Sequence, residues 1–160
     1  MSQHKSSAWP LALVYAAVIV YASLYPFAGW RNQGMSSWAF LASPWPRYWT
    51  GFDLVSNVLG YMPLGFLVAL GSRRTDDRMP AVVLATLVGG LLSLSMETVQ
   101  VYLPARVASN LDLGLNVLGC WLGAAIAWGL ERLGLLARWS QFRARWFVAD
   151  ARGALVLLAL

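Results

Sequence analysis

Cysteine and histidine are almost absent from this chain of 160 residues, which has one of each. The single cysteine, Cys120, excludes an internal disulfide and any metal site built from several cysteines. The single histidine, His4, lies in a polar N-terminal tail, so neither a histidine-based metal centre nor a Ser-His-Asp triad within one chain is expected. The sequence therefore predicts no metal site and no cofactor.

Charged residues are also scarce, at 12 % of the chain, whereas a soluble domain of this size usually carries about twice that share. Hydrophobic residues make up 59 % and gather in long blocks rather than in alternating or amphipathic patterns. Such blocks are typical of a membrane protein. The net charge of +5 does not indicate a nucleic-acid partner, because the arginines stand beside the apolar blocks, where topology and anionic lipid account for them.

Four apolar stretches are long enough to cross a membrane, which takes roughly 20 residues in a helix. They cover about residues 9–27, 53–71, 80–102 and 111–130. The sequence thus predicts an all-α integral membrane four-helix bundle in a domain of residues 9–130, followed by a membrane-associated tail of residues 131–160. The last apolar run, Ala154 to Leu160, is too short to span and is either the start of a further helix or a terminus on the membrane.

The basic residues predict the orientation of these spans. Four crossings place both termini and the 72–79 loop on one side, where nine of the 12 Lys and Arg residues fall. The other three are Arg31, Arg47 and Arg106, on the opposite side. Because positive residues favour the cytoplasm, we expect both termini to be cytoplasmic.

Two segments outside the spans are predicted to contact the membrane surface. The loop of residues 28–52 holds four tryptophans, and indole rings favour the headgroup zone, so it is an interfacial anchor or, alternatively, a lid over a site. After the fourth span, apolar residues recur at helical spacing among arginines. They are Leu135, Trp139, Phe142 and Trp146. This pattern predicts an interfacial amphipathic helix on the inner leaflet.

One polar motif occurs twice, each time at the start of a long apolar stretch. Asp53-Leu-Val-Ser-Asn57-Val-Leu-Gly60 recurs 59 residues later as Asp112-Leu-Gly-Leu-Asn116-Val-Leu-Gly119, with six of the eight positions identical. In each copy the Asp, Asn and Gly share one helix face. A carboxylate facing lipid near mid-membrane costs on the order of 3 kcal/mol, so both stripes should face the bundle interior. The repeat predicts two similar helical hairpins related by an axis along the membrane normal.

The predicted orientation brings the polar residues of the spans together on the extracytoplasmic side. The candidate ligand-binding residues are Asp53, Asn57, Glu97, Gln100, Arg106, Ser109, Asp112 and Asn116. In such a pocket the carboxylates would accept hydrogen bonds, Arg106 would hold a phosphate or carboxylate, and the amides would orient the ligand.

A structural interpretation of the same residues stays open. Asp53 and Asp112 could be helix N-caps, and the two asparagines could bond neighbouring helices. Glu97 could pair with Arg106. Capping does not, however, require an asparagine one turn deeper, so this interpretation explains the whole set less well than any single member.

The motifs together resemble a known family. They are Tyr21-Ala-Ser-Leu-Tyr-Pro-Phe27, Asp53-xxx-Asn57 with Pro63-Leu-Gly65, Glu97-xx-Gln100, Pro104-x-Arg106, Ser109-xx-Asp112 and Asn116-xx-Gly119. In order and spacing they look like the VanZ-like family over about residues 15–130. The resemblance implies a small multi-pass protein of the bacterial inner membrane. The name-giving member is associated with resistance to the glycopeptide teicoplanin, and no reaction is generally established for the family.

Three classes of function are compatible with these residues. The one we favour is a protein that binds or modulates a lipid-linked envelope precursor, another amphiphile or a lipoglycopeptide. The second is a membrane enzyme whose carboxylates act as acid and base or hold a cation, although no nucleophile motif is visible. The third is a transporter or a structural partner, for which four spans would require a homo-oligomer.

Overall fold

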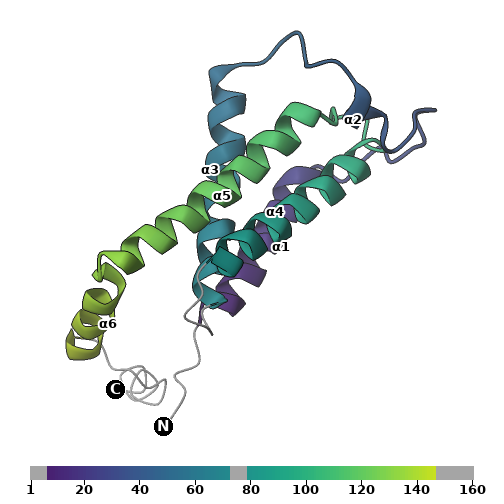
Figure 1. The fold of residues 1–160 in the computed structure, drawn as a ribbon. Coiled ribbons are helices and arrows are strands. Elements are labelled where there is room, and N and C mark those ends of the chain that lie inside the picture. The colour runs from purple at the N-terminus through teal and green to yellow at the C-terminus, as the bar shows by residue number, and fades with distance from the viewer. Residues whose placement is uncertain (1–6, 73–78, 147–160) are drawn as a thin grey trace, which may run out of the picture. The chain divides into compact units, whose positions relative to one another are not determined.

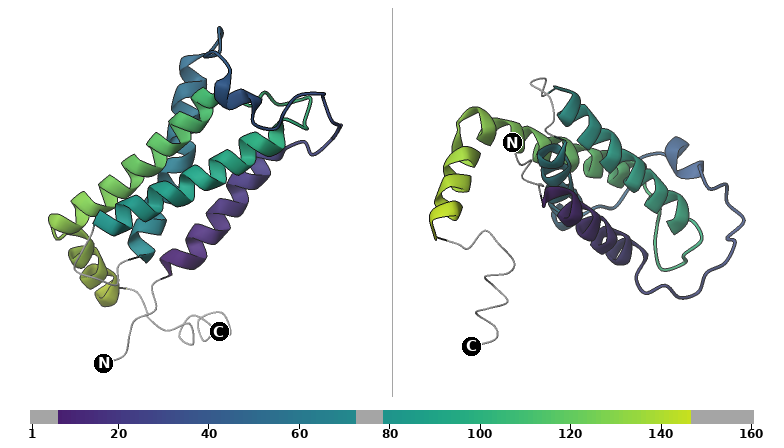
Figure 2. Two further views of the ribbon diagram at one scale, coloured as in Figure 1. Left: turned by 45° about the vertical axis from the view of Figure 1, so that its right-hand side comes forward. Right: turned by 90° about the horizontal axis from the view of Figure 1, so that it is seen from below.

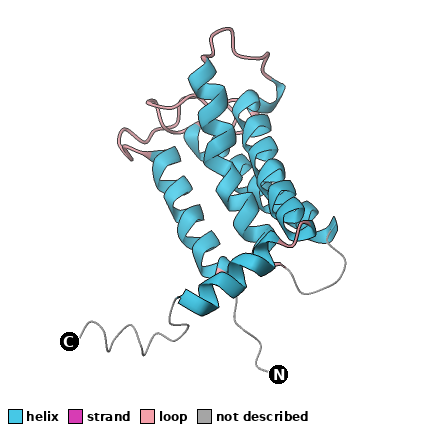
Figure 3. Cartoon of the chain, turned by 90° about the vertical axis from the view of Figure 1, so that its left-hand side faces the viewer, coloured by secondary structure: helices cyan, strands magenta, loops and turns pink. Residues whose placement is uncertain are grey.

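The computed structural model describes residues 7–72 and 79–146, and within them the chain forms six helices and no strand (Figures 1 and 3). The helices are α1 (Ala8–Leu24), α2 (Ala39–Ala42), α3 (Gly51–Gly71), α4 (Met79–Gln100), α5 (Asn110–Arg132) and α6 (Leu135–Trp146). The predicted all-α class is confirmed. His4, the basic residues of segment 73–78 and the apolar run Ala154 to Leu160 lie outside the described residues.

Three helices of the described part are long and apolar enough to cross a membrane, namely α3, α4 and α5. The first predicted span is shorter than expected, because α1 has 17 residues and ends at Leu24 rather than at residue 27. Pro26 explains the early end. Proline lacks an N–H and disfavours helical geometry in the residue before it, and Tyr25 accordingly has an extended ψ of 136°.

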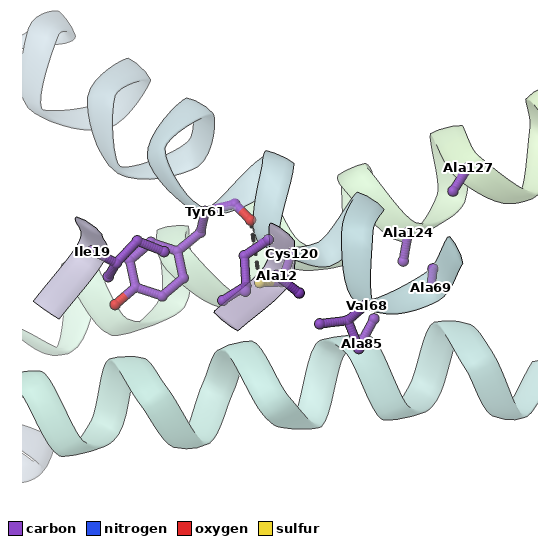
Figure 4. Packing of buried hydrophobic residues seen from close by; sticks show 10 residues of the cluster. Ala12, Ile19, Tyr61, Val68, Ala69, Ala85, Cys120, Ala124 and Ala127 are labelled. Atoms are coloured by element: carbon purple, nitrogen blue, oxygen red, sulfur yellow. Dashed lines mark hydrogen bonds between the residues drawn. The ribbon is translucent and has the colours of Figure 1, made fainter. Parts of the chain in front are cut away.

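The residues up to Ala127 form one compact unit. Within it α3 and α4 pack against each other, and α1 packs against both. The core consists mostly of small side chains from α1, α3, α4 and α5 (Figure 4). Among them Cys120 is fully buried, and its thiol donates to the carbonyl oxygen of Tyr61 at 3.3 Å. In lipid, the hydrophobic effect does not drive helices to associate. Small residues instead allow close approach and van der Waals packing between helices.

Glycines bring α5 into direct backbone contact with α3. A Cβ atom added at Gly119 would overlap the carbonyl of Val58, and one added at Gly123 would overlap the carbonyl of Met62. This backbone contact fixes the position of α5 along α3, and therefore which polar residues of the two helices lie opposite each other.

The residues from Trp128 onward form a second unit, which is described by itself. The last turn of α5 places the guanidinium of Arg132 over the ring of Trp128, 4.2 Å from its centroid. Gly134 then adopts a positive φ of 68°, a conformation that suits glycine at a helix end. The amphipathic tail predicted by the sequence is helical as α6, where the rings of Trp139 and Phe142 stack with centroids 5.8 Å apart.

Candidate functional site

The polar residues of the apolar helices meet at one end of the first unit. The C-terminal ends of α1 and α4 and the N-terminal ends of α3 and α5 lie there, together with the segments that connect them (Figure 2). A hydrogen bond from Gln100 Nε2 to the carbonyl oxygen of Ser23, at 2.9 Å, joins α4 to α1.

Asp53 belongs to a capping box at the start of α3. Its Oδ2 accepts the backbone N–H of Thr50 at 2.8 Å, while Thr50 Oγ1 accepts the backbone N–H of Asp53 at 3.1 Å. This exchange satisfies backbone donors that a helix start leaves open. Asp53 is exposed and belongs to the cap of α3, as the structural interpretation describes, but the N-cap residue itself is Thr50 and Asp53 is the third residue of the helix.

The start of α5 uses the same residue types with different partners. Ser109 stands 59 residues after Thr50, and its Oγ accepts the backbone N–H groups of Leu111 and Asp112 at 3.2 and 3.4 Å. The backbone N–H of Ser109, however, donates to Glu97 Oε2 at 2.7 Å. Glu97 of α4 therefore has the role at the start of α5 that Asp53 has at the start of α3. The carboxylate of Asp112 does not accept this backbone N–H.

The carboxylate of Asp112, which takes no part in the cap of α5, contacts α3 instead. Its Oδ1 accepts the side-chain amide of Asn57 at 2.9 Å. One turn further along α5, Asn116 Nδ2 donates to Ser93 Oγ of α4, also at 2.9 Å. The two copies of the repeated motif are thus not equivalent in their contacts: Asp53 bonds within its own helix start, whereas Asp112 and Asn57 join the two copies to each other.

Arg106 holds the end of α1. Its Nε donates to the carbonyl oxygen of Tyr25 at 3.1 Å and its Nη2 to that of Ala22 at 2.8 Å. The last carbonyls of a helix lack partners within the helix, and an arginine can satisfy them. The alternative pair of Glu97 with Arg106 is not present, since the contacts of both side chains in the described structure are with other groups.

These side chains surround a cavity of about 450 Å³. Six of the eight candidate residues line it: Asn57, Glu97, Gln100, Arg106, Asp112 and Asn116. The other two, Asp53 and Ser109, line an adjoining hollow of about 380 Å³ that shares Asn57, Arg106 and Asp112 with the first. The structure therefore brings the predicted residues together in two neighbouring spaces.

The innermost part of the cavity holds polar atoms without partners. Asn116 and Tyr61 are each 5 % exposed, and Asn116 Oδ1 and the Tyr61 hydroxyl have no hydrogen-bond partner in the described residues. Ser23 and Ser93 lie near the Tyr61 hydroxyl without completing a bond. Buried polar groups are rarely left unpaired, so each such group needs an explanation. Sequence analysis missed Tyr61, because a tyrosine inside an apolar span carries no signal of its own.

The carboxylates form a chain rather than a shell around one point. Asp112 lies close enough to both Asp53 and Glu97 to interact with each electrostatically. Within residues 7–72 and 79–146 no three His, Cys, Asp or Glu side chains are grouped so that they could hold a metal ion together. The arrangement offers hydrogen-bond acceptors along one wall of a partly apolar cavity.

The tryptophan-containing loop of residues 28–52, the aromatic loop, is hydrogen-bonded to the segment that follows α4. Gln33 Nε2 donates to the carbonyl oxygen of Val101 at 2.7 Å, and Asn110 Nδ2 donates to that of Ser43 at 2.6 Å. A third hollow of about 420 Å³ lies between the loop and this segment. Large aromatic side chains of the loop stay exposed, among them Trp45 at 73 %.

A family model described as VanZ/LLP1 matches residues 3–136, a range that contains all eight candidate residues. No curated protein and no solved structure matches this chain. The resemblance that the motifs indicated is confirmed by this family match.

Proposed function

The chain belongs to the VanZ/LLP1 family, and from that premise we propose that its polar cavity binds the head group of a lipid-linked or otherwise amphiphilic molecule of the bacterial cell envelope. Family membership and three helices long enough to cross a bilayer make it a membrane protein. A lipid-linked envelope precursor and a lipoglycopeptide are both molecules of the proposed class.

One observation carries this proposal, namely a polar cavity at one end of apolar helices. Its wall offers Glu97, Asp112 and Asn57, while the helices around it are apolar over most of their length. An amphiphile has the matching division between a polar head and an apolar tail. Ligand sites are typically concave, with a small number of placed polar groups that fix orientation.

The proposal includes an orientation in the inner membrane. It places both termini in the cytoplasm and the cavity on the extracytoplasmic side, because nine of the 12 basic residues fall on the opposite side of the predicted spans. Helix α1 serves as the fourth span, and the bundle consists of two hairpins. A helix of 17 residues is about 26 Å long, a mismatch that local thinning of the bilayer accommodates.

The same proposal puts α6 on the inner leaflet. Trp139 and Phe142 are exposed and stacked on each other, and Arg138 lies one residue before Trp139. A helix with aromatic and basic residues of this kind lies in the interface of an anionic membrane.

Binding of amphiphiles to the purified full chain tests the proposal. Delipidated protein is titrated with envelope lipids and read by native mass spectrometry, and Asn57→Leu is compared with wild type. This variant removes the amide that bonds Asp112 and adds an apolar side chain to the wall. Ser95→Ala is the matched control, since Ser95 is an exposed polar residue of α4 whose hydroxyl bonds only Leu91 of its own helix.

We expect Asn57→Leu to weaken binding and Ser95→Ala to leave it unchanged. Equal binding by all three proteins would mean that lipid associates with the apolar surface alone, and the proposal would then be wrong. Conversion of a bound molecule into a product during the titration would favour the enzyme among the alternative functions.

A further inference from the structure

We infer that the head group bound in the cavity carries a protonated primary amine. This inference rests on the proposed function, because it specifies the chemistry of the ligand at the same site. Its basis is the set of unpaired oxygen atoms that line the cavity, which includes the buried Asn116 Oδ1 and one oxygen of each of two carboxylates.

Three side chains of the cavity each direct a donor nitrogen toward an oxygen atom of the protein. Asn57 directs its amide nitrogen to the carboxylate of Asp112, and Gln100 directs its amide nitrogen to the carbonyl of Ser23. Both partners can only accept, so the orientation of each amide is fixed by its bond. Two nitrogens of Arg106 are likewise bonded to carbonyls of α1.

Unpaired acceptors are numerous in the cavity, although the second N–H of each amide and the Tyr61 hydroxyl are unpaired as well. Each amide that directs its nitrogen to the protein leaves its carbonyl oxygen free, which applies to Asn57 and Gln100. Glu97 uses only Oε2 and Asp112 only Oδ1 in the described structure, so each keeps one carboxylate oxygen free. These oxygen atoms can accept hydrogen bonds from a ligand that supplies donors.

The charge of the wall favours a cation. Glu97 is 4 % exposed and Asp112 is partly buried, and neither forms an ion pair with Arg106. A carboxylate in a low-dielectric site is costly without an opposite charge. An ammonium group supplies that charge together with three N–H donors, which match the two free carboxylate oxygens and one amide oxygen.

The lining also distinguishes among amines. Quaternary ammonium groups have no N–H and are recognised by cages of several aromatic rings. Tyr61 is the one aromatic residue among those that line the 450 Å³ cavity in the described structure. The cavity therefore suits a primary amine, whether it belongs to a lipid head group or to a free small amine.

The test compares three lipids with identical acyl chains on the delipidated full chain by native mass spectrometry. Phosphatidylethanolamine has the primary amine, phosphatidylcholine keeps the charge without N–H donors, and N-acetylphosphatidylethanolamine loses the charge. We expect phosphatidylethanolamine to bind about tenfold more tightly than the other two, the range of one charge-assisted hydrogen bond. Asp112→Asn and Glu97→Gln should reduce this preference, whereas Glu131→Gln, a charge-matched change outside the cavity, should keep it.

Free ethanolamine identifies the source of the amine. Competition by ethanolamine would support an amine pocket that does not need a lipid tail, and its failure to compete beside tight phosphatidylethanolamine binding would support a lipid-borne amine. Equal affinity for the three lipids, with binding still weakened by Asn57→Leu, would overturn the inference and leave the proposed function standing. Binding that no cavity variant weakens would overturn both.

Discussion

At the scale of single residues, hydrogen-bond partners determine roles that the spacing of the repeated motif does not determine. Asp53 and Asp112 occupy equivalent places in a repeated motif, yet the first caps its own helix and the second bonds Asn57 across two helices. The cause is Glu97, which accepts the N–H of Ser109 and so replaces Asp112 in the second cap. Sequence comparison of the two copies cannot reveal this exchange, because Glu97 comes from a third helix.

The bond from Ser109 to Glu97 predicts a difference between two variants. Glu97→Ala leaves a buried N–H without an acceptor, which costs about 1–3 kcal/mol. Glu97→Gln keeps a carbonyl oxygen at the same place and should lose much less. Thermal unfolding of both variants in one detergent measures the difference, and equal melting temperatures would contradict the role assigned to Glu97.

At the scale of helices, much of the secondary structure could be predicted from hydrophobic blocks. Helices α3, α4 and α5 begin and end within two residues of the predicted spans, because long apolar runs determine them. The end of α1 was wrong by three residues, since Pro26 stops a helix whose apolar run continues. The four-residue helix α2 was not predicted, because helices this short depend on local turns and not on periodicity.

The site was predictable as a set of residues but not as a set of contacts. Helix-face spacing identified five of the six candidate residues that line the 450 Å³ cavity, and the predicted orientation of the spans added Arg106. The role of Arg106 was not predictable, because a guanidinium that caps α1 and one that holds a ligand phosphate look alike in sequence. The place of Tyr61 in the site could be recognised only from the residues packed against it.

The glycine contact between α3 and α5 predicts that alanine substitution changes stability differently at two glycines of α5. Gly119→Ala forces a Cβ into the backbone of Val58 and should destabilise the protein by about 1–3 kcal/mol, as overpacking does. Gly114→Ala meets nothing within 4 Å and should be neutral or slightly stabilising. Thermal unfolding in detergent compares them, and a larger loss for Gly114→Ala would contradict the packing described.

The cap that Arg106 places on α1 predicts that its removal loosens this helix. Arg106→Ala should lower the melting temperature because the carbonyls of Ala22 and Tyr25 lose their donors. Arg106→Lys should recover only part of the loss, since one ammonium cannot reproduce the planar fork. Arg31→Ala serves as the control, because in the described structure Arg31 donates its hydrogen bond to Tyr102 through its backbone N–H. Full stability of Arg106→Ala would show that α1 needs no such cap.

At the scale of the whole molecule, the proposed topology has a chemical test in the native cysteine background. Cys120 is fully buried, so the unmodified protein should not react with a membrane-impermeant maleimide in intact cells. Its burial also makes Cys120 unsuitable as a crosslinking reporter for a homo-oligomer, which stays a prediction. Reporter cysteines at exposed positions can therefore be read without removing it.

Two reporters distinguish the sides of the membrane. Trp45→Cys replaces a residue of the aromatic loop that is 73 % exposed and should react from outside the cell. Leu133→Cys replaces a residue just after α5 that is 68 % exposed and should react only after the cells are opened. The reverse pattern would invert the orientation and put the cavity on the cytoplasmic side.

An experimental structure of the full chain, from crystals grown in a lipid mesophase that contains envelope lipids, would show directly whether the cavity binds a lipid head group. We expect a cavity that stays open between α3, α4 and α5, with a head group within hydrogen-bond distance of Glu97 and Asp112 and its tail along the apolar helices. A closed cavity filled by side chains, with Glu97 paired to Arg106, would contradict the claim and leave these residues a structural role alone.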